Sequence, residues 1–373
     1  MGCVRLVYNR ALAARTEGWY ERQVHVDYVH TSAMLTQWKK LEDLQFLNEV
    51  SSVPLQQGLR HLQKAFSNFF AGRARYPNFK KKRNGGSAEF TRSAFRWKDG
   101  QLWLAKCNEA LPIRWSRPLP EGERPSTITV KLDARGRWYV SLLVDNPSIK
   151  SLPTIDKSIG LDLGITSLIA TSNGDKVSNP KPFKRLYKKL RRVQKALNRK
   201  QLGSFNRDKA RLKVARVTAA IADTRKDFLH KLTTQLVREN QTIVVEDLSV
   251  SNMVKNHKLA QSISDASWGE LVRQLAYKCE WYGRELIKID RWFPSSKRCG
   301  CCGHIVEKMP LNIREWNCPK CGMHHDRDIN AAKNILAVGH TVSVCEANIR
   351  PDNQMVEGQL RKTRKGKKQK LKQ

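Results

Sequence analysis

Two pairs of cysteines constrain the fold of this chain more than any other feature. Cys299 and Cys302 form the first pair, and Cys318 and Cys321 form the second, after fifteen intervening residues. This spacing is typical of a zinc ribbon, in which each CxxC pair directs two thiolates toward one ion. Four thiolates complete a tetrahedron, so we expect one structural zinc ion. Cys301 is a fifth thiol that could replace a ligand of the first pair, although its spacing fits less well.

The other four cysteines are scattered, at positions 3, 107, 279 and 345. Such a distribution does not resemble a disulfide framework, and the N-terminus shows no signal-peptide pattern. We therefore expect a protein of the reducing cytoplasm with one metal site. No apolar stretch is long enough to span a bilayer, so the sequence predicts no membrane partner.

The charge of the chain indicates a polyanionic partner. Lys and Arg number 69 against 34 Asp and Glu, which gives a formal charge of +35. An excess of this size repels itself in a compact fold unless counter-charge is supplied. Nucleic acid is the expected partner, because phosphate contacts by Lys and Arg release condensed counterions. A membrane surface is the alternative, but the aromatic residues have core-like spacings instead of lining one basic helical face.

Changes in apolar periodicity along the chain divide it into expected domains. The first is helical. The second is a small antiparallel β-barrel or sandwich with a hairpin turn at Asp99-Gly100, and the barrel is the favoured form. The third is α/β and contains a basic helical hairpin. The zinc ribbon, a last helical motif and a basic tail, expected to be disordered, follow. The helical region is 1–87, the β-domain is 88–150, and the α/β domain is 151–290 with its hairpin at 181–240. The zinc ribbon is 291–323, the last motif is 324–345 and the tail is 346–373. A solvated surface is the alternative interpretation of the hairpin, and contact with a nucleic-acid duplex is the favoured one.

Three acidic residues lie in unusual contexts. Asp162 is inside the apolar strand "IGLDLGI", Glu246 ends the apolar strand "TIVVE", and Asp328 immediately precedes the helical stretch "INAAKNILA". A carboxylate in an apolar strand is costly unless a cation faces it. The three could converge on two Mg²⁺ ions about 3.5–4 Å apart, which would activate a water and stabilise the leaving oxygen of a phosphodiester.

Each carboxylate also has a structural interpretation. Asp328 could be a helix N-cap, and Asp162 and Glu246 could be paired structural carboxylates. Asp247 and Asp326 are neighbours that could exchange roles with the candidates. Alternation along a strand places Asp247 on the opposite face from Glu246.

Several segments resemble a known family. "GLDLGI", "VVEDLSVSNM", "PSSKRCGCCG", "CPKCG" and "HDRDINAAKNI" are similar to the TnpB (OrfB) proteins of bacterial insertion sequences, which are relatives of the type V CRISPR nucleases. Upstream segments such as "LNEVSSVPLQQGLRHLQKAFSNFF" and "WGELVRQLAYKCEWYGREL" extend the resemblance to about residue 340.

The resemblance implies an α/β fold with a RuvC-like, ribonuclease H-like nuclease domain into which the zinc ribbon is inserted. It places the catalytic, magnesium-binding carboxylates at Asp162, Glu246 and Asp328. It implies a transposon-encoded endonuclease with a guide RNA from the element's end and a double-stranded DNA target, in the bacterial cytoplasm and nucleoid. The alternatives are a strand-transfer transposase and a guide-dependent DNA-binding protein without cleavage.

Two features depart from the family pattern. Cys301 occupies a position where the family usually has a small polar residue. The chain also enters a helix almost at Met1, whereas TnpB-like chains usually open with a strand of the small barrel. From this we expect an N-terminally truncated chain that lacks the first barrel strand.

Overall fold

The computed structural model describes residues 1–120, 122–147, 149–310 and 312–349, with side chains described up to residue 341. Contacts divide the chain into two compact units. One contains Met1–Ser151, Pro180–Lys231 and Trp281–Gly283, and the other contains Leu152–Asn179, Leu232–Glu280 and the chain from Arg284 onward. Most of the predicted basic tail, from residue 350, lies outside the described residues.

The first unit begins with helices that pack on a small antiparallel sheet. The helical elements are α1 (Gly2–Arg22), α2 (Tyr28–Trp38), α3 (Ser52–Phe70) and the short 3₁₀ helices η1 (Glu42–Asn48), η2 (Lys82–Asn84) and η3 (Arg92–Ala94). The sheet has the order β1-β4-β5, from Gly86–Thr91, Thr127–Leu132 and Trp138–Leu143. The apolar stripe of α3, including Leu55, Leu59 and Leu62, shares one core with Ile128 of β4.

A separate hairpin joins β2 (Phe95–Lys98) to β3 (Gln101–Leu104). Its turn residues Asp99 and Gly100 both have positive φ, at 49° and 72°, as a two-residue type I′ turn requires, so the turn prediction is confirmed. The described strands between residues 86 and 143 form this hairpin and the three-stranded sheet. Closure into a barrel stays a prediction.

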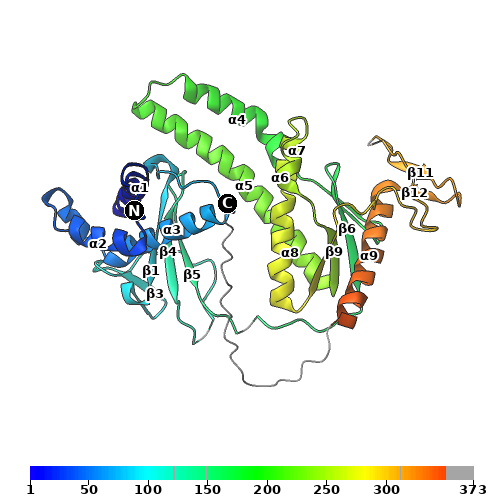
Figure 1. Cartoon of the computed structure of the whole chain (residues 1–373), viewed down its shortest axis with the longest axis horizontal. Helices are drawn as coiled ribbons and strands as arrows, with labels where there is room; N and C mark the ends of the chain where they lie inside the picture. Colours follow the sequence, from blue (N-terminus) through cyan, green and yellow to red (C-terminus); the bar gives the residue numbers. More distant parts are fainter. Residues whose placement is uncertain (121, 148, 311, 350–373) are drawn as a thin grey trace, which may run out of the picture. The chain divides into compact units, whose positions relative to one another are not determined.

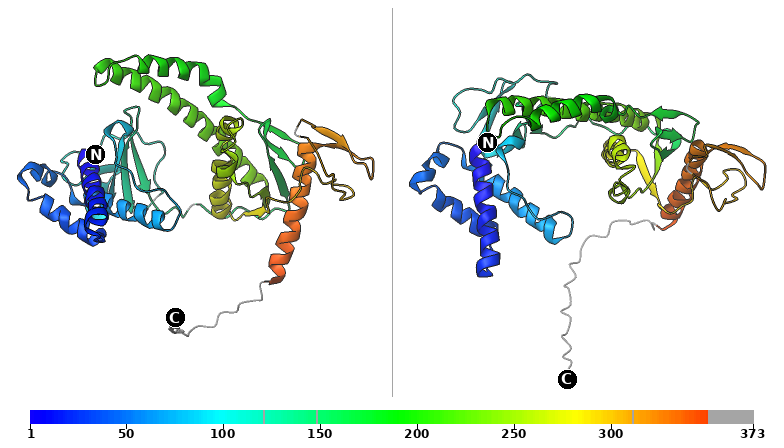
Figure 2. Two further views of the ribbon diagram at one scale, coloured as in Figure 1. Left: turned by 45° about the horizontal axis from the view of Figure 1, so that its top comes forward. Right: turned by 90° about the horizontal axis from the view of Figure 1, so that it is seen from above.

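Two long helices, α4 (Pro182–Asn198) and α5 (Phe205–Glu239), run side by side in opposite directions (Figures 1 and 2). Leu190 of α4 packs against Val217 and Ile221 of α5. This apolar seam is narrow, and most of the remaining surface of α4 is exposed Lys and Arg. The helical form predicted for residues 181–240 is therefore confirmed.

The second unit is built on a five-stranded sheet with the order β10-β9-β6-β7-β8. β6, β7 and β8 form an antiparallel meander, whereas β9 is parallel to β6 and β10 is parallel to β9. From β6 to β10 in chain order, these strands are Ser158–Leu163, Ser167–Thr171, Lys176–Ser178, Thr242–Glu246 and Glu285–Ile289. The unit's helices are α6 (Val250–Met253), α7 (Ala260–Ala266), α8 (Trp268–Tyr282) and α9 (Arg327–Ile349).

Helix α9 packs closely on the sheet (Figure 1). A Cβ atom at Gly160 of β6 would lie 2.2 Å from the Ala332 carbonyl oxygen, a distance that van der Waals contact forbids. The glycine of "GLDLGI" therefore allows α9 to cross β6 two residues before Asp162. The helix continues to Ile349, four residues beyond the predicted end of this motif.

The predicted zinc ribbon, 291–323, contains β11 (Glu315–Asn317), which pairs antiparallel with β12 (His324–Asp326) just beyond the predicted end of the ribbon. β12 leads directly into α9. Among the residues that the structure describes, we find no helix that combines the length and the apolar character needed to cross a bilayer.

Candidate active site and metal centre

The strand register places Asp162 and Glu246 at the same edge of the sheet. β6 and β9 are neighbours and parallel, with Leu161 opposite Val245. The next residues, Asp162 and Glu246, therefore follow this pair at the carboxyl ends of adjacent strands. Asp328 is the second residue of α9, the helix that crosses β6. Thus a carboxylate from each of three elements points to one region.

The charges of Glu246 and Asp328 both act on Asp162. Burial raises the pKa of Asp162 to about 7, and the negative charges of Glu246 and Asp328 contribute to that rise. Within the described chain, no hydrogen bond or ion pair reaches the Asp162 carboxylate. A buried carboxylate near two like charges, with no direct cationic partner of its own, is costly to ionise. A hard divalent cation with carboxylate oxygen ligands would relieve that cost, so the donor set fits Mg²⁺.

The other two carboxylates have polar neighbours. Burial raises the pKa of Glu246, and the hydrogen bond that the Ser295 hydroxyl donates to the Glu246 carboxylate lowers that pKa by less. Asp328 lies 3.3 Å from Arg314 Nη1 and 3.8 Å from Lys176 Nζ. Ser295, Arg314 and Lys176 were not predicted as site residues. Their proximity depends on tertiary topology, and no local pattern in the sequence indicates it.

The helix N-cap is Asp326, so the interpretation of Asp328 as the cap is wrong. One carboxylate oxygen of Asp326 accepts the backbone N–H groups of Asp328 and Ile329, each at 3.0 Å. Its second oxygen lies 2.6 Å from Lys176 Nζ. Asp247, the other neighbour, pairs with Arg291. Both neighbours are thus engaged in structural contacts.

The four cysteines of the two CxxC pairs meet at one point. Their Sγ atoms all lie within 4.8 Å of one another, with Cys299 3.7 Å from Cys321 and Cys302 3.5 Å from Cys318. Zinc–sulfur bonds of about 2.3 Å in a tetrahedron require sulfur–sulfur separations of about 3.8 Å. The donor set therefore fits one Zn²⁺. Cys301 is exposed and lies outside the group.

A histidine of β12, the strand that leads into α9, contacts the cysteine cluster. His325 Nε2 lies 3.0 Å from Cys299 Sγ, and its ring packs on Trp316 with centroids 4.9 Å apart. This histidine was missed in the sequence, although its position four residues after Cys321 could have indicated a contact with the thiolates.

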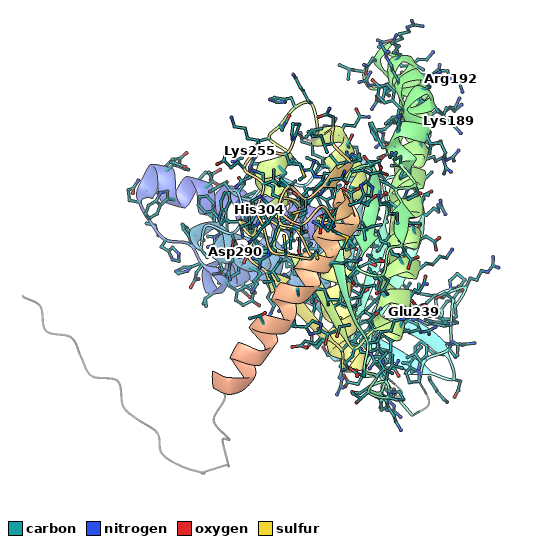
Figure 3. All side chains as sticks on the ribbon, turned by 90° about the vertical axis from the view of Figure 1, so that its right-hand side faces the viewer. Lys189, Arg192, Glu239, Lys255, Asp290 and His304 are labelled. Atoms are coloured by element: carbon teal, nitrogen blue, oxygen red, sulfur yellow. The ribbon has the colours of Figure 1, made fainter. Side chains whose placement is uncertain are left out.

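A basic groove follows the α4–α5 hairpin. The groove has a volume of about 390 Å³. Cationic side chains from both helices line an apolar floor, and the lining residues are Leu186, Lys189, Arg192, Val193, Lys213, Arg216, Val217 and Ala220. Figure 3 shows Lys189 and Arg192 on the green ribbon of the hairpin. Four cations over an apolar floor form a surface that suits a phosphate backbone.

Three family models match the chain. The model described as "Probable transposase" matches residues 141–257. The model described as "Cas12f1-like, TNB domain" matches residues 268–335, which include the four cysteines and Asp328. A "Helix-turn-helix domain" model matches residues 1–23.

Relatives match over most of the chain. A protein of Streptomyces pristinaespiralis named "Putative RNA-guided DNA endonuclease" is 60% identical over 354 residues, which are 95% of this chain and 88% of that protein. An Escherichia coli K12 protein named "Putative RNA-guided DNA endonuclease InsQ" is 33% identical over 92% of this chain and 88% of its own length.

A solved structure shares the fold. The cryo-EM structure titled "Cas12f1-sgRNA-target DNA complex" contains a chain that aligns with 89% of this chain and 80% of its own length. The TM-score is 0.52 and the sequence identity is 17%.

Proposed function

Because the chain belongs to the TnpB (OrfB) family, we propose that it is a transposon-encoded, RNA-guided DNA endonuclease. The observation that supports this proposal is that Asp162 and Glu246 end neighbouring parallel strands, and that burial and the charges of Glu246 and Asp328 all raise the pKa of Asp162. The names of the relatives support guided cleavage of DNA as the activity.

We assign the nuclease domain to the RuvC-like, ribonuclease H-like class. Its five-stranded sheet supports this assignment, because an antiparallel meander is followed by two parallel strands added on the side of the first strand. The domain boundaries predicted from the sequence, with the ribbon inserted before the last motif, are part of the proposal.

Asp162, Glu246 and Asp328 would hold two Mg²⁺ ions. When bound, these ions would supply Lewis-acid stabilisation of the phosphodiester oxygens and lower the pKa of the attacking water. Asp162 must be ionised to bind a cation. With a pKa of about 7 it is partly protonated at neutral pH, and a bound cation would favour the carboxylate form. Arg314 and Lys176, which lie at Asp328, add positive charge beside the carboxylates.

The structural Zn²⁺ would be held by Cys299, Cys302, Cys318 and Cys321, one ion per chain. Guide RNA and double-stranded target DNA are the proposed partners. The basic hairpin, with Lys189 and Arg192 at its groove, is proposed to follow the phosphate backbone, while base pairing supplies most of the sequence specificity. Such a protein would act at the nucleoid in the bacterial cytoplasm.

The experiment is cleavage of double-stranded DNA by protein purified with its copurifying RNA, which is sequenced to define the target. We expect cutting of the matching DNA in Mg²⁺ and none without RNA. Asp162→Asn should remove cutting while RNA and DNA binding persist. RNA-independent joining of DNA ends would instead indicate a strand-transfer transposase, and guided binding by wild-type protein without cutting would indicate a non-cleaving binder.

A further inference from the structure

Two buried asparagines of α9 hold the segment that leads into the first cysteine pair. Asn334 Nδ2 donates to the carbonyl oxygens of Ser295 and Arg298, at 2.8 and 2.7 Å. Asn330 Nδ2 donates to the same Arg298 oxygen at 2.7 Å, and Asn330 Oδ1 accepts the backbone N–H of Gly300 at 2.9 Å. Asn330 and Asn334 are only 2% and 5% exposed. We call residues 295–300 the bridging segment.

The bridging segment contacts a candidate metal ligand at its N-terminal end and contains another near its C-terminal end. Near its C-terminal end it contains Cys299, one of the four clustered thiols. At its N-terminal end the Ser295 hydroxyl donates to the Glu246 carboxylate. Ser295 is 6% exposed, so water does not compete freely for that bond. One short stretch of chain therefore contacts both the thiolate cluster and the carboxylate cluster.

Helix α9 connects this segment to the third carboxylate. Asp328 lies on its first turn, and Asn334 lies six residues further, which is about 9 Å along the axis. A helix is stiff over that distance. Its close packing on β6 at Gly160 fixes it against the strand that carries Asp162. A continuous series of contacts therefore links Glu246 to Asp328 through Ser295, Asn334 and the helix.

The hydrogen bonds explain why amides are needed at these positions. The Arg298 carbonyl accepts from both asparagines, and the Gly300 N–H requires an acceptor. A carboxylate in place of Asn334 would face two carbonyl oxygens. An alkyl group would remove the amide donor from the Ser295 carbonyl and leave the Arg298 carbonyl with only the donor from Asn330. Only a side chain with N–H donors completes the contact at Asn334.

We propose that Asn330 and Asn334 are positioning residues that couple the zinc ribbon to the nuclease metal site. Zinc binding holds Cys299 and with it the bridging segment, and the segment holds Glu246 where it shares a divalent cation with Asp162 and Asp328. Loss of zinc or of the asparagine contacts therefore weakens divalent-cation binding at the carboxylates. This inference rests on the proposed function.

The first test measures Mn²⁺ affinity, by calorimetry, on the zinc-loaded full chain without RNA. Asn334→Ala should weaken Mn²⁺ binding by about tenfold or more, the usual effect of removing an outer-sphere partner. Ser295→Ala should weaken it similarly. The double variant should bind nearly as well as Asn334→Ala alone, because both changes break one path. If Asn334→Ala does not fold, Ser295→Ala provides the test. It deletes only the hydroxyl group that donates to Glu246, so it should disturb folding less.

The matched control is Ile335→Val. Ile335 neighbours Asn334 on α9 and is fully buried in a cluster with Val244 and Ile287, and its apolar side chain makes none of the hydrogen bonds to the bridging segment. This variant should lower the melting temperature and keep the wild-type Mn²⁺ affinity. If Asn334→Ala binds Mn²⁺ as tightly as Ile335→Val, or if its effect adds fully to that of Ser295→Ala, the coupling is overturned.

The second test removes zinc. Cys321→Ser should lose the zinc ion and weaken Mn²⁺ binding by about tenfold, whereas Cys301→Ser should keep both. Unchanged Mn²⁺ affinity in the zinc-free variant would overturn the coupling but not the proposed carboxylate site. Asp162→Asn separates the two hypotheses, because Mn²⁺ binding that survives this change would overturn the proposed carboxylate site itself and the coupling with it.

Discussion

Asp326 and Asp328 are two residues apart and have different contacts. Asp326 caps α9 and pairs with Lys176, so Asp326→Ala should lower the free energy of unfolding by about 1 kcal/mol while some cutting remains. Asp328→Asn removes a negative charge that repels Asp162 but also pairs with Arg314 and Lys176, so it should change stability little and should abolish cutting. Thermal melting and guided cleavage assays on both variants provide the measurement. Full cutting by the Asp328 variant would contradict the carboxylate assignment.

At the scale of single residues, the sequence could identify the candidate site residues but not the side chains that contact them in the fold. The spacing of the cysteines was enough to predict a cluster, because two CxxC turns need little else to approach one ion. The N-cap could not be assigned, because Asp326 and Asp328 both precede the helical pattern and only the backbone geometry decides between them. Ser295 follows a strand in a polar loop, and its contact with Glu246 depends on β10 lying beside β9.

At the scale of the elements, Gly160 controls how α9 packs on the sheet. Gly160→Ala would place a Cβ against the Ala332 backbone, so we expect α9 to shift and the free energy of unfolding to fall by about 1–3 kcal/mol. Guided cutting should fall as well, because Asp328 moves with the helix. Gly269→Ala in α8 is the matched control: a Cβ added there would meet no atom within 4 Å, so this change should be neutral or slightly stabilising. Equal melting temperatures for the two variants would contradict this account.

The α4–α5 hairpin gives a second prediction at this scale. Lys189→Gln combined with Arg192→Gln removes two of the four cations that line the groove. If both contact duplex phosphates, the slope of log affinity for the guide–target duplex against log salt should become shallower by about 1.8. Gln194→Ala, on the exposed surface of the same helix, should leave the slope unchanged. A wild-type slope for the double variant would mean that the groove does not contact the nucleic acid.

On the scale of the whole molecule, the sequence predicted local elements better than their assembly. The TnpB resemblance is confirmed by relatives that match over most of the chain. The hairpin helices could be predicted because their signals are local. The sheet order β10-β9-β6-β7-β8 could not, because it pairs β6 with β9 across about eighty residues of intervening chain, and no periodicity encodes such pairing. For the same reason, closure of a barrel from the strands of the first unit stays a prediction.

The net charge of the whole chain leads to the last prediction. Residues 357–373, which lie outside the described residues, contain eight Lys or Arg and one Glu, so deleting them lowers the formal charge from +35 to +28. We expect weaker affinity for the guide RNA and a shallower salt dependence, because fewer counterions are released on binding. Cutting at saturating RNA should persist, because the carboxylate cluster lies elsewhere in the sequence. A variant of full length with the eight basic residues changed to Gln is the matched control, and it should behave like the deletion if charge alone matters. Binding titrations over a range of salt concentrations measure both effects, and an unchanged slope in either variant would contradict a role for the tail in RNA binding.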